Sequence, residues 1–187
     1  MKTVLTLLAV ATILATPNLS ASQTSSEPAN PVIRAGIPES DGELSPQVQQ
    51  HISRGDDLST HLRFDAAVRE YRKAADVARR EGHLPSGTSW KMANAAYYNG
   101  NLLDAAAVLD QLADEAARFG DLAVEALALY NSAWLNGKAG RKTETAARVG
   151  RLEDLLRSQY MPVAIRERLN SWLKTSKELA AVPAGGN

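Results

Sequence analysis

The stretch RFDAAVREYRKAADVA, residues 63–78, decides the fold class of this chain. Its residues Ala67, Tyr71 and Ala74 follow the spacing small-x3-large-x2-small, which places all three on one face of a helix. The same spacing recurs in two later stretches, NLLDAAAVLDQLADEA at 101–116 and RKTETAARVGRLEDLL at 141–156. The stretches follow one another at similar intervals, so they indicate an internal repeat built from helices.

Each stretch follows another predicted helix, which carries a small residue twelve positions before the first small residue of the stretch. These residues are Gly55, Ala93 and Ala133. Two antiparallel helices joined by a tight turn approach closely, and a small residue on the first helix leaves room for a bulky residue of the second. One such hairpin cannot cover its own apolar face, so neighbouring hairpins must stack. We therefore expect an all-α fold of about three antiparallel helix hairpins and a C-terminal capping helix.

Local signals place the ends of the helices. We predict helices over residues 46–60, 64–81, 88–99, 102–119, 122–138, 143–157 and 162–180. The first helix starts at Ser45-Pro46, because a serine oxygen caps a helix and proline fits the first helical position. Gly82 and Gly120 are expected to end helices with positive φ, and Asp121 is expected to cap the helix that follows. Pro85-Ser86-Gly87 is expected to form a turn.

The first hairpin resembles the tetratricopeptide repeat family. Its matching residues are Gly55, Phe64, Ala67, Tyr71 and Ala74, at the glycine, aromatic, alanine, aromatic and alanine positions of the family. The second unit keeps Ala93 and Ala105. In the third unit Thr145 replaces the alanine and Gly150 interrupts the second helix. The resemblance covers roughly residues 46–157, in units longer than the family's usual length of about 34 residues. The alternative is an alanine-rich helical bundle that resembles the family by accident.

The resemblance implies that the first helix of each hairpin lines a concave, superhelical surface that binds a peptide or another protein. Six residues are candidates for this groove: Trp90, Asn94, Tyr97, Tyr98, Tyr130 and Trp134. Aromatic side chains with a polar group suit peptide capture, because they bury a large area and still form hydrogen bonds. At each position the alternative role is packing between hairpins. For the set, we expect at least two of the five candidates other than Tyr98 to line the concave surface.

The last predicted helix is expected to cap the array with an apolar inner stripe. The stripe would consist of Leu169, Trp172, Leu173 and Leu179, and the outer side would carry Arg166, Arg168, Lys174 and Lys177. A terminal unit of a repeat array needs such a polar outer side because no further unit covers it.

The N-terminal segment indicates export. Residues 1–21 show the three-part pattern of a secretory signal peptide, with a positive start, an apolar run over residues 4–15 and small residues for cleavage after Ala21 or Ser22. A buried N-terminal helix or an uncleaved anchor is the alternative. We expect the chain to be periplasmic or extracellular, with no stable membrane insertion after cleavage.

The remaining chain divides by composition. The expected segments are a flexible linker at 22–44, the helical domain at 45–181 and a flexible tail at 182–187. The linker is rich in serine, proline, glycine and acidic residues, which bury little apolar area. The linker contains one short apolar stretch, Val32-Ile33. We expect it to be part of the linker; the alternative is that it docks on the helical domain or on a partner.

The composition and the motifs give no support for catalysis. Lysine plus arginine equals aspartate plus glutamate at 21 each, so nothing in the bulk charge favours nucleic acid. The chain has no cysteine, and His51, His61 and His83 do not have the spacing of metal ligands on one helix face. Phosphate-binding, HExxH and G-x-S-x-G motifs are missing from the sequence. We expect no catalytic residue, no metal site and no cofactor.

Charged residues are expected to form solvated faces. One basic cluster comprises Arg69, Arg72, Lys73, Arg79 and Arg80, and the other comprises Arg141, Lys142, Arg148 and Arg151. Both lie on second helices, on the convex side, where interleaved acids give local pairs at helical spacing. Binding of an acidic partner or an anionic envelope polymer is the alternative role of these clusters. The carboxylate pairs Asp56-Asp57 and Asp114-Glu115 are expected to be solvated as well. The sequence thus predicts a non-catalytic adaptor that binds a protein or a peptide, with a self-associating structural spacer of the cell envelope as the alternative.

Overall fold

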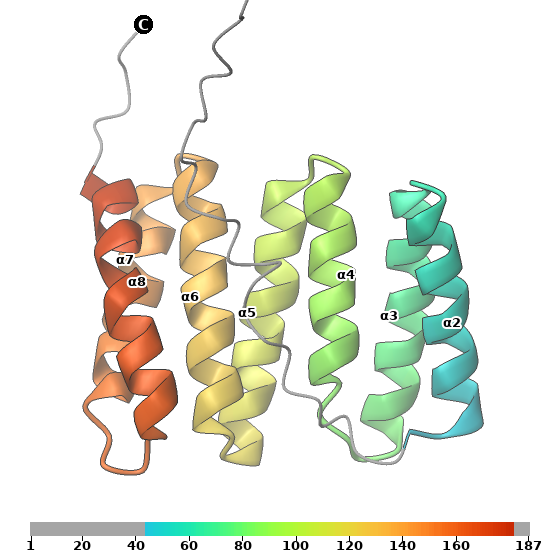
Figure 1. The fold of residues 1–187 in the computed structure, drawn as a ribbon, viewed down its shortest axis with the longest axis horizontal. Helices are drawn as coiled ribbons and strands as arrows, with labels where there is room; N and C mark the ends of the chain where they lie inside the picture. Colours follow the sequence, from blue (N-terminus) through green and yellow to red (C-terminus); the bar gives the residue numbers. More distant parts are fainter. Residues whose placement is uncertain (1–43, 182–187) are drawn as a thin grey trace, which may run out of the picture.

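The computed structural model describes residues 44–181, with side chains as far as residue 173. These residues form seven helices and no strand: α2 Pro46–Thr60, α3 Phe64–Arg80, α4 Ser86–Tyr98, α5 Leu102–Phe119, α6 Leu122–Lys138, α7 Lys142–Leu156 and α8 Val163–Ala181 (Figure 1). The predicted all-α class is confirmed. The predicted signal peptide, the tail and all of the linker except Leu44 lie outside the described residues.

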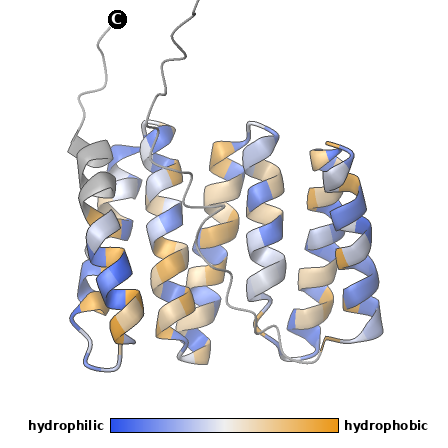
Figure 2. Cartoon of the chain, in the orientation of Figure 1, coloured by the Kyte–Doolittle hydropathy of each residue, from blue (hydrophilic) through white to orange (hydrophobic). Residues whose placement is uncertain are grey.

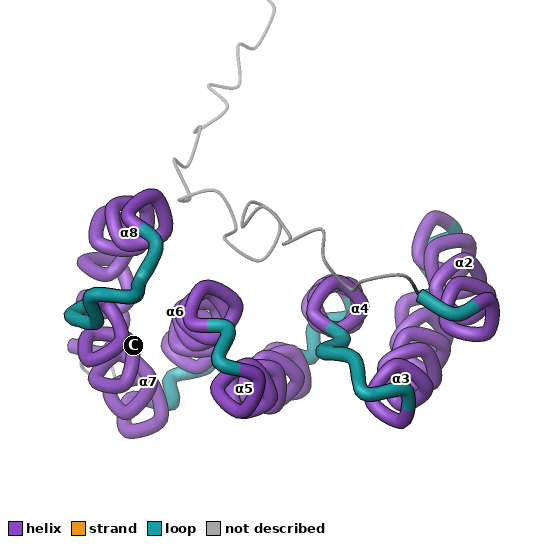
Figure 3. The backbone as a smooth tube through the Cα atoms, turned by 90° about the horizontal axis from the view of Figure 1, so that it is seen from below, coloured by secondary structure: helices purple, strands orange, loops and turns teal. Residues whose placement is uncertain are grey.

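The helices pack in chain order as antiparallel pairs. Seen from the end of the helices, α2, α4, α6 and α8 form one row, and α3, α5 and α7 form a second row behind it (Figure 3). The double row is curved, and the first helices of the hairpins line its concave side. The last helix, α8, packs against both α6 and α7, as expected for a cap. Hairpins α2–α3, α4–α5 and α6–α7 therefore stack side by side.

The repeated small and large residues lie where the two helices of a hairpin pack against each other. Ala67, Ala105 and Thr145, the first small residues of the three stretches, are completely buried. An ideal Cβ built on Gly55 would lie 2.4 Å from Cε1 of the buried Tyr71 ring, so only glycine fits there. The prediction that a small residue admits a bulky one is thus confirmed for the first hairpin. The Thr145 hydroxyl, which replaces an alanine methyl, donates to the main-chain oxygen of its own helix 2.8 Å away.

The predicted helix ends are confirmed within two residues. Pro46 occupies the first turn of α2 behind Ser45. Gly82 and Gly120 have φ of 82° and 74°, the left-handed conformation that closes a helix at low cost in glycine. The Asp121 side chain caps α6 by accepting a hydrogen bond from the main-chain N–H of Val124 at 3.0 Å.

The start of α4 differs from the prediction. The helix begins at Ser86, two residues before the predicted start, and Gly87 belongs to its first turn. Pro85 precedes the helix, and its carbonyl oxygen accepts a hydrogen bond from the N–H of Ser89 at 2.9 Å. The Pro-Ser-Gly sequence therefore leads directly into a helix, because a proline just before the first turn needs no N–H donor.

The core is largest at the centre of the array. Every residue of α6 from 124 to 136 is buried, whereas α2 buries only Val48 and Gly55. Figure 2 shows the same contrast, with hydrophobic residues along much of α6 and a mostly hydrophilic α2. The cap α8 contributes Leu169 and Leu173 to the main core, and Trp172 packs against it, as predicted for the inner stripe; the fourth predicted residue, Leu179, lies beyond the described side chains. No helix of the described residues combines the length and the apolar character needed to cross a membrane.

Candidate functional site

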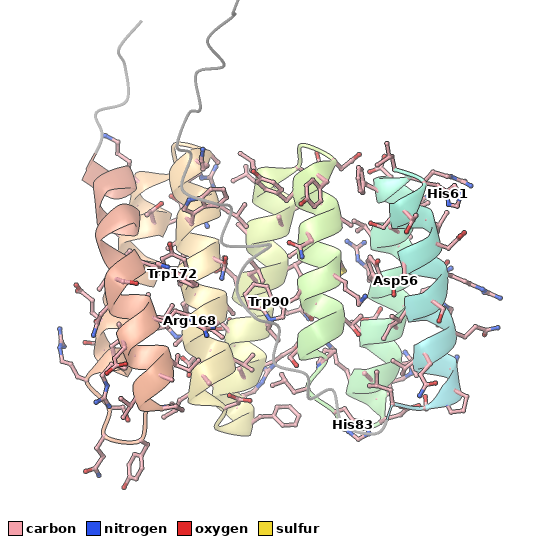
Figure 4. The ribbon with its side chains drawn as sticks, viewed as in Figure 1. Asp56, His61, His83, Trp90, Arg168 and Trp172 are labelled. Carbon is pink, nitrogen blue, oxygen red and sulfur yellow. The ribbon has the colours of Figure 1, made fainter. Side chains whose placement is uncertain are left out.

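A hollow of about 610 Å³ opens between the first and second hairpins, where α2 and α4 end and α3 begins. We call it the head hollow. Its lining residues are Asp56, Ser59, Thr60, Leu62, Phe64, Tyr71, Lys91, Asn94 and Tyr98. Figure 4 shows Asp56 on the part of the first hairpin next to α4. Two of the predicted groove residues, Asn94 and Tyr98, thus meet in a real concavity.

The polar wall of the head hollow is an ionic network that joins three helices. Oδ1 of Asp56 on α2 accepts hydrogen bonds from the Tyr71 hydroxyl on α3 and from Nζ of Lys91 on α4, each at 2.8 Å. Burial raises the pKa of the Tyr71 hydroxyl, and the bond to the Asp56 carboxylate raises it further, so Tyr71 is a neutral donor. The Asp56 side chain is 45 % exposed, as expected for a solvated carboxylate, and it is also paired with Lys91 of the next hairpin. The charges of Asp56 and Lys91 neutralise each other.

An unsatisfied acceptor lies beside this network. Oδ1 of Asn94 is buried and accepts no hydrogen bond within the described part of the chain. A buried acceptor without a donor costs free energy that an incoming N–H or O–H group would recover. Asn94 therefore offers a specific point of attachment for a ligand that brings a donor.

A row of aromatic rings borders the hollow and runs across all three hairpins. Ring centroids are 5.6 Å apart for Phe64 and Tyr98, 5.6 Å for Tyr98 and Tyr97, and 5.9 Å for Tyr97 and Trp134. Nζ of Lys138 lies 5.3 Å from the Trp134 ring centroid and ends the row. We call these four rings the aromatic row. Tyr98 is 50 % exposed, so the row presents an aromatic surface to solvent at the head hollow.

The rim of the hollow carries a strained residue. Leu62 has φ of 58°, a left-handed conformation that disfavours a branched side chain, and it is 74 % exposed. The equivalent corners of the second and third hairpins have Gly100 and Gly140 instead. The first hairpin thus keeps an exposed apolar side chain where glycine would be the relaxed choice, and such strain is commonly found at functional sites.

The six predicted groove residues divide into three groups: buried in the core, half-buried in the aromatic row, and lining the head hollow. Trp90, Tyr130 and Trp134 are at most 3 % exposed and belong to the core, which is the role that the sequence left open as the alternative. Tyr130 packs against Trp172 of α8, with ring centroids 5.2 Å apart. Tyr97 is half-buried in the aromatic row.

Asn94 and Tyr98 are the two predicted groove residues that line the head hollow. The sequence analysis did not place other lining residues in a groove, among them Leu62, Phe64, Tyr71 and Lys91. The available signal was the corner Leu62-Arg63, where the first hairpin lacks the glycine found at the other two corners.

The basic clusters on the convex side do more than form local pairs. Lys73 and Arg141 pair within their own helices, as predicted. In contrast, Arg148 of α7 binds the Asp110 carboxylate of α5 through two nitrogens, with Nε at 2.9 Å from Oδ1. Arg151 of α7 contacts both Asp114 of α5 and Glu125 of α6. These arginines join the third hairpin to the second.

A third cross-helix pair corrects one prediction. Glu115 is only 6 % exposed, and its Oε1 accepts from Nε of Arg79 on α3 at 2.9 Å. The expected solvated position of Glu115 is therefore wrong, because the neighbouring hairpin covers it. Within residues 44–173 no three histidine, cysteine or acidic side chains gather as a possible metal site. His51 instead pairs with Glu70 at 2.8 Å between α2 and α3.

Comparison with family models, curated proteins and solved structures finds no match to this chain. The head hollow and the aromatic row are therefore interpreted from their own geometry.

Proposed function

We propose that this chain is an exported adaptor of the tetratricopeptide type that catalyses no reaction and binds a segment of another protein in the head hollow. The stacked antiparallel hairpins and the match of Gly55 and Tyr71 to the family's glycine and aromatic positions support the family. The signal-peptide pattern of residues 1–21 supports export.

One observation carries the proposal: the head hollow combines an exposed aromatic platform with a buried acceptor that has no donor. The platform is Tyr98 stacked on Phe64, and the acceptor is Oδ1 of Asn94. A peptide segment supplies both complements, since its side chains bury apolar area on the rings and its main-chain N–H groups donate. The volume of about 610 Å³ holds a few side chains.

The charges of the hollow favour an uncharged contact at its centre. Asp56 and Lys91 are already paired with each other, so a charged ligand group would have to compete with that pair. We therefore expect a partner segment with an apolar or aromatic side chain at the point of contact and a hydrogen-bond donor beside it.

The test uses Tyr98→Ser with Leu103→Ser as the matched control. Tyr98 is 50 % exposed and lines the hollow, whereas Leu103 is 46 % exposed on α5 and lies outside its lining. Neither change empties the core, so both variants are expected to keep the helical circular dichroism of the wild type. A partner captured from the native envelope fraction is expected to be lost with Tyr98→Ser and kept with Leu103→Ser. If Tyr98→Ser retains every captured partner, the head hollow is not the binding site.

A self-associating spacer is the second candidate, because exposed apolar residues occur at both of the edges of the array where the helices end. Leu62 and Tyr98 lie at one edge, and Tyr160 and Val163 lie at the other.

A further inference from the structure

The exposed large apolar side chains of the described residues fall into two groups. The first group is at the head hollow and comprises Leu62 and Tyr98, whereas Leu103 is exposed on α5 outside the lining of the hollow. The second group lies at the opposite ends of the helices, near the end of α5 and the start of α8: Phe119, Tyr160 and Val163, which are 56 %, 77 % and 63 % exposed. Grouped apolar exposure of this kind marks interaction surfaces rather than random surface residues.

Two members of the second group, Phe119 and Tyr160, line a separate hollow of about 450 Å³. The lining residues are Phe119, Gly120, Asp121, Leu122, Ala123, Tyr160 and Pro162, from the α5–α6 corner and the loop between α7 and α8. We call this the tail patch. It shares no residue with the head hollow.

Tyr160 projects from a loop that is held in place. Nη2 of Arg166 donates to the main-chain oxygens of Ser158 at 2.7 Å and Met161 at 3.2 Å, on either side of Tyr160. The Met161 side chain is 2 % exposed and anchors the loop in the core. The ring of Tyr160 is therefore presented to solvent by a fixed backbone, which lowers the entropy lost when it binds.

We propose that the tail patch of one copy binds the head hollow of a second copy, with the Tyr160 ring on the Tyr98–Phe64 platform. The two surfaces complement each other in hydrogen bonding as well as in apolar contact. The Tyr160 hydroxyl supplies the donor that the buried Oδ1 of Asn94 lacks. The ring is uncharged, as the internally paired Asp56 and Lys91 require of an occupant.

Each surface has one exposed charge beside it that is opposite in sign to the other, in addition to Asp121, which lines the tail patch. Asp65 follows Phe64 at the head and is exposed, and it accepts one hydrogen bond from the Asn99 side chain at 2.5 Å. Arg118 precedes Phe119 at the tail, is exposed, and forms no ion pair within the described residues. The chain as a whole has a formal net charge of +0, so copies do not repel one another at long range.

The contact joins different surfaces, because the head hollow involves α2 to α4 and the tail patch involves α5 to α8. Such a heterologous contact leaves each pair of copies with one free head and one free tail, and it builds open chains unless the rotation closes a ring. This inference adds a second copy of the chain as an occupant of the head hollow, and it rests on the part of the proposed function that makes this hollow a binding site.

Sedimentation velocity of the purified full chain over a wide concentration range tests the inference. Wild type and Leu103→Ser are expected to form a series of oligomers. Tyr98→Ser removes the platform at the head, and Tyr160→Ser removes the projecting ring at the tail. Each of these two variants alone is expected to sediment as a monomer. An equal mixture of the two is expected to form a dimer and nothing larger, because one variant keeps an intact tail and the other keeps an intact head.

Three outcomes overturn the inference. Wild type that stays monomeric at every concentration has no such contact. Tyr98→Ser that associates like wild type shows that tails pair with tails or that another surface is responsible. A mixture of the two variants that stays monomeric rules out the head-to-tail pairing. The proposed function is judged separately, since Tyr160→Ser keeps the head hollow and is expected to capture external partners as wild type does.

Discussion

Replacement of Gly55 by alanine is expected to destabilise the first hairpin, although alanine is the better helix former. An added Cβ would lie 2.4, 2.6 and 2.9 Å from three atoms of the Tyr71 ring, distances that real Cβ atoms essentially never show. The ring cannot swing away, because it is 3 % exposed and its hydroxyl is bonded to Asp56. Either α2 and α3 must separate or the ring must leave its position.

The magnitude follows from a comparison with Gly150. Both glycines lie inside helices, and alanine gains about 1 kcal/mol over glycine at either position from helix propensity alone. An added Cβ at Gly150 meets nothing within 4 Å, so Gly150→Ala is expected to stabilise the chain by that amount. At Gly55 the overpacking costs about 1–3 kcal/mol in addition. The two alanine variants should therefore differ by about 1–3 kcal/mol, with Gly55→Ala the less stable.

Urea denaturation followed by circular dichroism measures both variants against wild type, with equal m-values as the sign of an unchanged transition. Tyr71→Leu in the Gly55→Ala background is expected to cost less than Tyr71→Leu alone, because the clash is relieved. Equal free energies of unfolding for Gly55→Ala and Gly150→Ala would refute the close packing of the first hairpin.

Three further predictions concern the ionic and strained positions. Arg148→Met leaves Asp110 without its bidentate partner and is expected to lower the free energy of unfolding by about 1–3 kcal/mol, with a smaller loss in high salt, as measured by urea titration. Hydrogen bonds from Lys73 and His51 lower the pKa of Glu70 below its usual 4.5, so its contribution is present above that pH and is lost as pH falls through the lowered value. The stability difference between wild type and Glu70→Gln should accordingly shrink between pH 7 and strongly acidic conditions. Leu62→Gly is expected to be about 1 kcal/mol more stable than Leu62→Ala, because only glycine relaxes the positive φ; equal melting temperatures would contradict this.

Much of the fold could be predicted because its signals are local. Pro46 and Asp121 mark helix starts, and Gly120 marks an end, through the conformations and hydrogen bonds of a few adjacent residues. The packing of Gly55 against Tyr71 could also be predicted, since the turn fixes how two adjacent helices of one hairpin face each other.

The candidate site was harder to predict, because it depends on how one hairpin is rotated against the next. Trp90 and Tyr98 lie on the same short helix, yet Trp90 is completely buried and Tyr98 is 50 % exposed. A hydrophobicity pattern cannot separate them, because α4 has apolar residues on more than one side and packs against both α3 and α5. The meeting of Asp56 with Lys91 has the same origin, since their helices belong to different hairpins.

The third hairpin shows what a repeat pattern leaves out. Its sequence departs from the pattern at Thr145 and Gly150, yet α7 runs unbroken through both and packs on α6. Arg148 and Arg151 of α7 each bind to both α5 and α6. Arg148 donates to Asp110 on α5 and Ser132 on α6, and Arg151 donates to Asp114 on α5 and Glu125 on α6. Guanidinium groups with several fixed donors can thus fix the register of a hairpin whose apolar match is weak. A search for small and large residues alone underestimates such a unit, because long-range ion pairs have no fixed spacing along the chain.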